Sequence, residues 1–142
     1  MLNDLIRERR KKLSDIQEAG RNPYPSKSRR SFSVAEALEN FSKLQKNKSQ
    51  VTLAGRVGSI RDQGNLLFID IDDGTDSIQI LLSKKQAHHF DFWKKNLDLG
   101  DFVEFRGSLM KTKRGEESLQ AVKTRMLTKS LRPLPKSWFG LK

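Results

Sequence analysis

The chain has 142 residues, the length of a single domain, and it is long enough to bury a core without disulfides or metal ions. It has no cysteine, which excludes a disulfide scaffold, thiolate metal sites and a cysteine nucleophile. The formal net charge of +11 favours a polyanionic partner, with nucleic acid the first choice and an anionic membrane surface the second. No apolar run approaches the roughly 18 residues of a membrane span, and the start is no secretory signal, so we expect a soluble cytoplasmic protein.

The basic charge is unevenly distributed along the chain. Residues 1–50 and 111–142 contain an excess of Lys and Arg, whereas residues 51–110 contain slightly more acidic than basic residues. This distribution predicts a folded central part that reads a ligand and flanking parts that contact a polyanionic backbone.

Residues 1–50 have a helical pattern. Asn3 is a candidate N-cap and Gly20 a candidate stop for a first helix with a thin apolar stripe. The basic run at residues 7–12 suits either a solvated helix face or contacts to phosphates, and the sequence leaves both open.

A connector and a second helix follow. Residues 21–25 contain two prolines and are expected to be extended, because each proline disfavours helix in the residue before it. Ser33 and Glu36 have the spacing of a capping box, which predicts a second helix that ends near residues 46–47.

From Val51 the apolar pattern alternates with a period of two. It predicts strands at about 51–61, 65–73, 77–83, 101–109 and 117–127, with a helix over residues 84–97. This order of elements is that of an OB-fold, a five-stranded Greek-key barrel, so we expect a mainly β domain preceded by N-terminal helices. The side chains expected inside the barrel are Leu67, Ile69, Ile71, Ile78, Ile80, Leu82, Val103 and Phe105.

Two residues on the outer face of the predicted barrel are of particular interest, one with an aromatic ring and one with a primary amide. Alternation places Phe68 on the outer side of the second strand, beside Asp70, and Gln79 on the outer side of the third strand. The ring can stack on a nucleobase, and the amide can donate to and accept from its edge. OB-folds bind oligonucleotides on these two strands. The alternative is an exposed aromatic residue without a function.

No group of residues has the spacing of a catalytic site or a metal site. His88 and His89 are adjacent, so on a helix surface they point about 100 degrees apart and cannot bind one metal. The acidic residues at 70–76 lack the spacing of a calcium-binding loop, and turn formation accounts for them. We therefore expect no catalytic residue, metal or cofactor in this chain.

The chain is expected to fall into three segments. They are a helical segment at 1–50, the barrel at 51–128 and a linker at 129–142. The linker contains Leu134 and Trp138 and is too apolar for a free tail, so we expect it to dock on another surface.

Several motifs along the chain are shared with one family. They are Arg21-Asn-Pro-Tyr-Pro25, Val51-Thr-Leu-Ala-Gly-Arg-Val57, Arg61 with Gly64 and Phe68, Ile78-Gln79, Gly115-Glu116 and Lys129-Ser-Leu-Arg-Pro-Leu-Pro135. In these motifs the chain resembles the N-terminal region of bacterial-type class II lysyl-tRNA synthetases. The barrel motifs are common to the aspartyl, asparaginyl and lysyl enzymes, and the last motif favours the lysyl enzymes. Ile60 departs from the family, in which a second basic residue often precedes the arginine.

The resemblance implies a function for four residues. Phe68 would stack on the central anticodon base of a lysine tRNA, a uridine, and Gln79 would bond the Watson–Crick edge of that base. Arg61 would hold the base or its backbone, and Glu116 would contact a neighbouring anticodon base. The full-length enzymes of this family use ATP and Mg²⁺ and form homodimers, and their catalytic motifs do not occur in this chain.

Three other functions are compatible with parts of the pattern. A general single-strand binder would have the same fold but no base preference, and a structural module would use the apolar tail for docking. A membrane-surface protein has the required charge but needs a longer basic amphipathic helix, so we rank it last.

Overall fold

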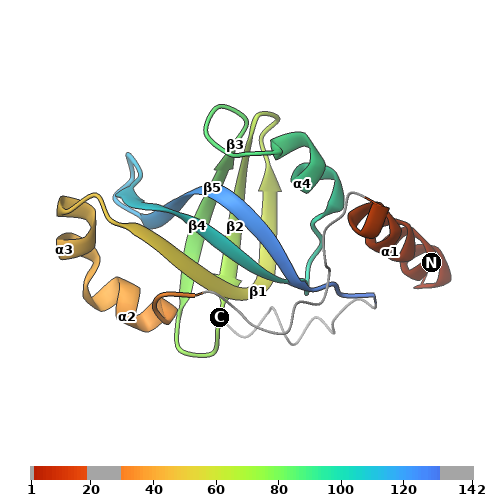
Figure 1. The fold of residues 1–142 in the computed structure, drawn as a ribbon, viewed down its shortest axis with the longest axis horizontal. Coiled ribbons are helices and arrows are strands. Elements are labelled where there is room, and N and C mark those ends of the chain that lie inside the picture. Colours follow the sequence, from red (N-terminus) through yellow and green to blue (C-terminus); the bar gives the residue numbers. More distant parts are fainter. Residues whose placement is uncertain (1, 19–29, 132–142) are drawn as a thin grey trace.

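The strands form a closed barrel with the element order of an OB-fold (Figure 1). The computed structural model describes residues 2–18 and 30–131. Its strands are β1 (Gln50–Asp62), β2 (Leu66–Asp72), β3 (Ser77–Ser83), β4 (Phe102–Lys111) and β5 (Glu117–Thr128). They follow the order β1-β2-β3-β5-β4, and β4 pairs with β1 to close the barrel. The β3–β5 pair is parallel, and the other pairs are antiparallel. The predicted fold is confirmed.

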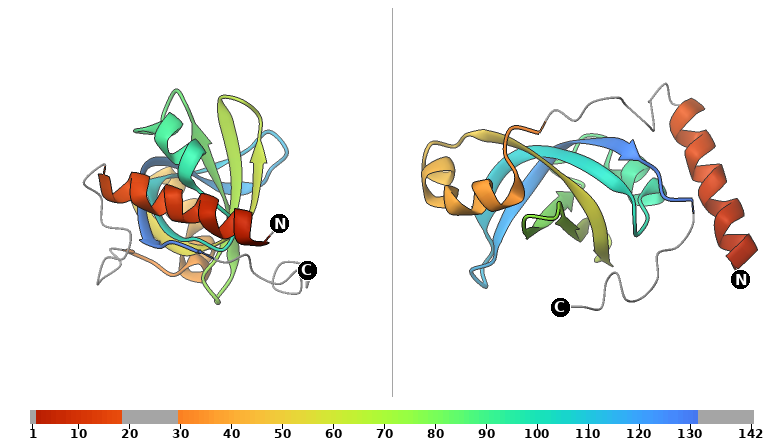
Figure 2. Two further views of the ribbon diagram at one scale, coloured as in Figure 1. Left: turned by 90° about the vertical axis from the view of Figure 1, so that its right-hand side faces the viewer. Right: turned by 90° about the horizontal axis from the view of Figure 1, so that it is seen from below.

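Helices lie at both ends of the barrel. They are α1 (Leu2–Glu18), α2 (Val34–Glu39), α3 (Phe41–Lys46) and α4 (Phe90–Asn96). Helices α2 and α3 lie at one end, and α1 and α4 lie at the other (Figure 2). In the described parts of the chain, no helix combines the length and apolar character needed to cross a bilayer.

The single helix predicted after residue 33 is in fact two helices. The capping box is present as predicted, because Glu36 N–H donates to Ser33 Oγ and Ser33 N–H donates to a Glu36 carboxylate oxygen. The helix is broken at Asn40, whose φ of −104° and ψ of 18° are not helical. The Glu36 carbonyl accepts hydrogen bonds from both the side-chain amide and the backbone N–H of Asn40, which ends the first of the two helices.

The helix predicted over residues 84–97 is shorter than expected. Residues 84–89 form turns, and His89 has a left-handed φ of 59° immediately before α4 begins at Phe90. His88 and His89 therefore precede the helix, and the prediction that they lie on its surface is wrong.

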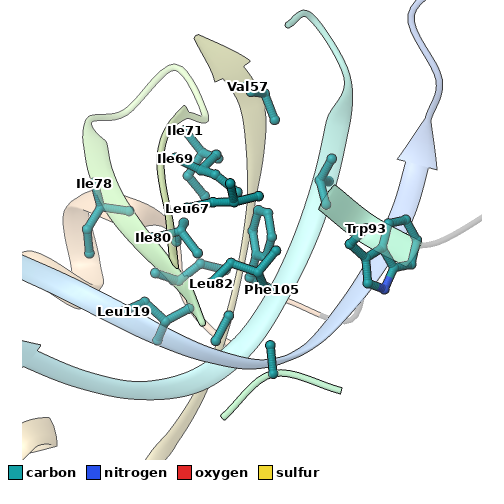
Figure 3. Packing of buried hydrophobic residues seen from close by; sticks show 14 of the residues in the cluster. Val57, Leu67, Ile69, Ile71, Ile78, Ile80, Leu82, Trp93, Phe105 and Leu119 are labelled. Carbon is teal, nitrogen blue, oxygen red and sulfur yellow. The ribbon is translucent and has the colours of Figure 1, made fainter. Parts of the chain in front are cut away.

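The core is built from alternate strand residues, as predicted (Figure 3). The eight side chains expected inside the barrel are all buried, and Phe105 from β4 is fully buried among them. At one end of the barrel Trp93 of α4 is 1% exposed, and at the other end Phe41 of α3 is also 1% exposed. On the outer side, Phe68 and Asp70 of β2 are partly exposed, whereas Gln79 and Leu81 of β3 are buried.

A buried ion pair joins the start of β4 to the end of β5. Lys129 Nζ donates to Asp101 Oδ2 at 2.7 Å and to Asp98 Oδ2 at 2.8 Å, and it also donates to the Asn96 carbonyl. The Lys129 and Asp101 side chains are completely buried. The first residue after β5 is therefore packed against the barrel.

Helix α1 docks on this buried pair through its basic run. Lys12 Nζ donates to Asp98 Oδ1 at 2.8 Å, and Arg9 Nη1 donates to Ser130 Oγ at 3.2 Å. Ile16 on the same helix is fully buried. Part of the basic run predicted to be solvated or bound to phosphate therefore binds the protein itself. The predicted stop at Gly20, the connector at 21–25 and the apolar tail lie outside the described residues.

Substitution of Lys129 tests how much the buried ion pair contributes to the stability of the fold. We expect Lys129→Met to destabilise the protein by about 3–5 kcal/mol, because it leaves the Asp101 carboxylate buried without its partner. Chemical denaturation followed by circular dichroism measures the change. The matched control is Lys95→Met, which removes the partner of Asp15 at a site where the lysine side chain is 69% exposed. The control should cost less than about 1 kcal/mol, and equal losses would contradict the prediction.

The pH dependence of stability tests the docking of α1. Burial raises the pKa of Asp98, but hydrogen bonds from Lys12 and Lys129 and their charges outweigh it, so the pKa lies below its usual range. A lowered pKa in the folded state gives stability that is present above the unfolded pKa of about 3.9 and is lost as the pH falls through the folded pKa. We expect Asp98→Asn to have a lower free energy of unfolding than the wild type at pH 7. The difference between the two proteins should disappear at acidic pH. Denaturant titrations between pH 2 and 7 measure it, and a gap that is constant with pH would contradict the prediction.

Candidate nucleic-acid interface

Arg61 and Phe68 form a stacked pair on the outer face of β1 and β2. The two residues are direct partners in the β1–β2 register. The Arg61 guanidinium carbon lies 4.7 Å from the centre of the Phe68 ring, within the range of a cation–π contact. Phe68 is half-buried and Arg61 is exposed. The pair therefore presents a flat aromatic ring and a flat cation at one place.

Gln79 lies on the same outer face but is not exposed as the sequence predicts. It pairs with Asp70 across β2–β3, one diagonal step from Phe68, and only 5% of its surface is exposed. Its Oε1 accepts a hydrogen bond from Arg61 Nη2 at 3.2 Å, and its Nε2 donates to Ser118 Oγ at 3.0 Å. The Arg61 and Ser118 side chains pack against the amide, so alternation alone overestimates the exposure of Gln79.

Glu116 is linked to this group through its backbone. Its carbonyl accepts a hydrogen bond from Ser118 Oγ at 3.2 Å. The turn that carries it contains Gly115, whose positive φ of 83° is a conformation that glycine adopts without strain. The Glu116 N–H donates to Thr112 Oγ1, and the Glu116 side chain is exposed. Hydrogen bonds therefore link Arg61, Gln79 and, through Ser118, the Glu116 carbonyl. Phe68 joins this group through its contact with Arg61.

Ser118 belongs to this surface and is absent from the sequence-based prediction. It lies on β5, pairs with Gln79 in the parallel β3–β5 register and is fully buried. A serine at the start of a strand has no feature that distinguishes it in the sequence. Only the parallel pairing, which joins residues far apart in the chain, brings it next to Gln79.

The surface around Phe68 is not strongly basic. Asp70 and Asp72 lie on the same face of β2, and Asp70 accepts a hydrogen bond from Ser59 Oγ at 2.7 Å. Carboxylates repel phosphate, so this part of the surface is suited to the flat faces and polar edges of bases.

The acidic residues near β2 stabilise turns. Asp73 accepts hydrogen bonds from the N–H groups of Val34 and Thr75, and Asp72 accepts one from Gly74 N–H. Burial raises the pKa of Asp73, but these hydrogen bonds outweigh it and lower the pKa overall. Among the residues that the structure describes, no three His, Asp or Glu side chains come together as a metal site.

The closed barrel and its flat, hydrogen-bonding outer face define a nucleic-acid-binding domain. The sequence pattern of the family described as OB-fold nucleic acid binding domain matches residues 51–128, and the chain belongs to this family.

Lysine–tRNA ligases are among the relatives of this chain. The ligase of Roseiflexus castenholzii is 40% identical over 143 residues, which cover 99% of this chain and 29% of the ligase. The ligase of Dehalococcoides mccartyi strain 195 is 39% identical over 94% of this chain and 28% of the ligase. The chain thus spans less than a third of the length of these curated relatives. The resemblance to lysyl-tRNA synthetases inferred from the motifs is confirmed.

Proposed function

We propose that this chain binds the anticodon loop of a lysine tRNA and reads its central uridine. The observation that carries the proposal is the group formed by Arg61, Phe68 and Gln79 on the outer face of β1, β2 and β3. The similar proteins are named lysine–tRNA ligases, and for this reason we propose a lysine tRNA as the RNA.

Each residue of the group has a separate part in the binding. A base stacks on the pair formed by the Phe68 ring and the Arg61 guanidinium that lies over it, and Arg61 contributes positive charge. Gln79 bonds the Watson–Crick edge of the stacked base through its amide. Glu116, next to Ser118 in the β4–β5 turn, contacts a neighbouring anticodon base. Lys and Arg residues elsewhere in the chain contact phosphates and make the affinity depend on salt.

The whole protein is proposed to be a class II lysine–tRNA ligase of the cytoplasm. It joins lysine to the tRNA with ATP and Mg²⁺ and acts as a homodimer, as the resemblance implies. In this proposal, the described residues of this chain bind and orient the RNA.

Removal of the Phe68 ring tests the stacking step. We expect Phe68→Ala to weaken binding of a lysine-type anticodon stem-loop by about 1–3 kcal/mol, the usual contribution of one stacked base. The half-buried ring lies outside the core, so the circular dichroism spectrum should not change. The matched control is Phe102→Ala, which removes a half-buried ring that also lies under an arginine, 5.7 Å from Arg56, on another part of the barrel. Equal affinities of Phe68→Ala and the wild type in a fluorescence titration would remove the stacking step.

A change of the central base tests the reading step. The wild type should bind the stem-loop with a central U more tightly than the same stem-loop with a central C, and Gln79→Ala should lose this preference. The control is Gln120→Ala, a partly exposed glutamine on β5, which should keep it. Equal binding of both RNAs by the wild type, falling steeply with salt, would instead indicate a general single-strand binder.

A further inference from the structure

The Gln79 amide is held in one orientation by two partners that cannot exchange roles. A guanidinium has only donors, so the amide atom 3.2 Å from Arg61 Nη2 must be the oxygen. Ser118 is on the other side of the amide, 3.0 Å away, and its hydroxyl can in general donate or accept.

The Ser118 hydroxyl has its direction set by a third group. It donates its one hydrogen to the Glu116 carbonyl at 3.2 Å, and a carbonyl can only accept. The Ser118 oxygen is therefore left as an acceptor, and the amide atom facing it must be the nitrogen. Every hydrogen bond in the series from Arg61 through Gln79 and Ser118 to the Glu116 carbonyl therefore has a fixed donor and a fixed acceptor.

The orientation of the amide determines which base edge it matches. With two bonds made inside the protein, Oε1 keeps a second lone pair and Nε2 keeps a second hydrogen for a ligand. Uracil presents the O4 acceptor followed by the N3–H donor, and cytosine presents the N4 donor followed by the N3 acceptor. For a base held in one position, an amide with Nε2 facing O4 and Oε1 facing N3–H pairs with uracil. The same amide rotated by 180° pairs with cytosine instead.

We infer that Ser118 is a specificity-determining residue that makes the site prefer uracil to cytosine by preventing Gln79 from turning over. The inference rests on the proposed function, in which Gln79 reads a stacked base. Ser118 is fully buried and does not touch the RNA, so it acts through Gln79 as a positioning residue. Arg61 provides a second restraint from the exposed side. The loss of Ser118 therefore weakens the discrimination without abolishing it.

The test is Ser118→Ala, assayed with the central-U and central-C stem-loops. We expect the ratio of the two affinities to fall about two- to tenfold, the usual net contribution of one neutral hydrogen bond. A purely structural role for Ser118 would lower both affinities together and leave their ratio unchanged. The matched control is Ser59→Ala, which removes a hydroxyl that bonds Asp70 on the same outer face and should leave the ratio unchanged. Ser118→Thr keeps the hydroxyl and should keep the preference for U.

A measurement on the free wild-type protein covers the case in which Ser118→Ala does not fold. In nuclear magnetic resonance spectra, the Gln79 side-chain amide protons should show Overhauser contacts to the Ser118 β protons, because the nitrogen faces Ser118. If the Gln79 side-chain amide protons show no Overhauser contact to either Ser118 β proton, the inference is wrong, and no variant is needed to establish this.

The outcomes separate this inference from the proposed function. If the wild type prefers U and Ser118→Ala keeps the full preference, the role of Ser118 is wrong and the proposed function stands. If the wild type does not distinguish U from C, the reading step of the proposed function fails and the role of Ser118 fails with it.

Discussion

The short parallel pairing of β3 with β5 is the constraint on which the barrel and its candidate site both depend. It closes a sheet whose other neighbours are antiparallel, so β3 does not remain an edge strand with unpaired backbone groups. The same pairing places Ser118 beside Gln79 and brings the β4–β5 turn with Glu116 to the outer face of β3. A shift of one residue in this register would turn Ser118 to the other face of its strand and remove the restraint on the Gln79 amide.

The buried ion cluster and the proposed interface lie on different parts of the barrel. The buried cluster of Asp101, Lys129 and Asp98 ties the start of β4, the end of β5 and helix α1 together. Removing charges from water is costly, and such a cluster is favourable only because each charged group finds several partners. The group around Phe68 lies outside the core, on the outer face of the first three strands.

The side chains of the proposed interface are already held in place in the protein without a ligand. Both polar atoms of the Gln79 amide are hydrogen-bonded, and the residue is almost fully buried. Little rotational freedom of the side chain therefore remains to be lost on binding. Arg61 serves two purposes, because its guanidinium covers the Phe68 ring and also bonds the Gln79 oxygen. The carboxylates of Asp70 and Asp72 make the surface unfavourable for phosphate, and this favours contact through bases.

The strand order of the barrel and the face on which the candidate site lies could be predicted from local sequence patterns. Strand alternation is a local signal, and it placed the core residues inside and put Phe68 and Gln79 on the outer side. The capping box at Ser33 was equally local. Only the tertiary structure decided that Gln79 is buried, that Ser118 is its partner and that Lys12 binds Asp98. These contacts join residues far apart in the chain, and their geometry follows from strand register and barrel closure, which no local pattern encodes.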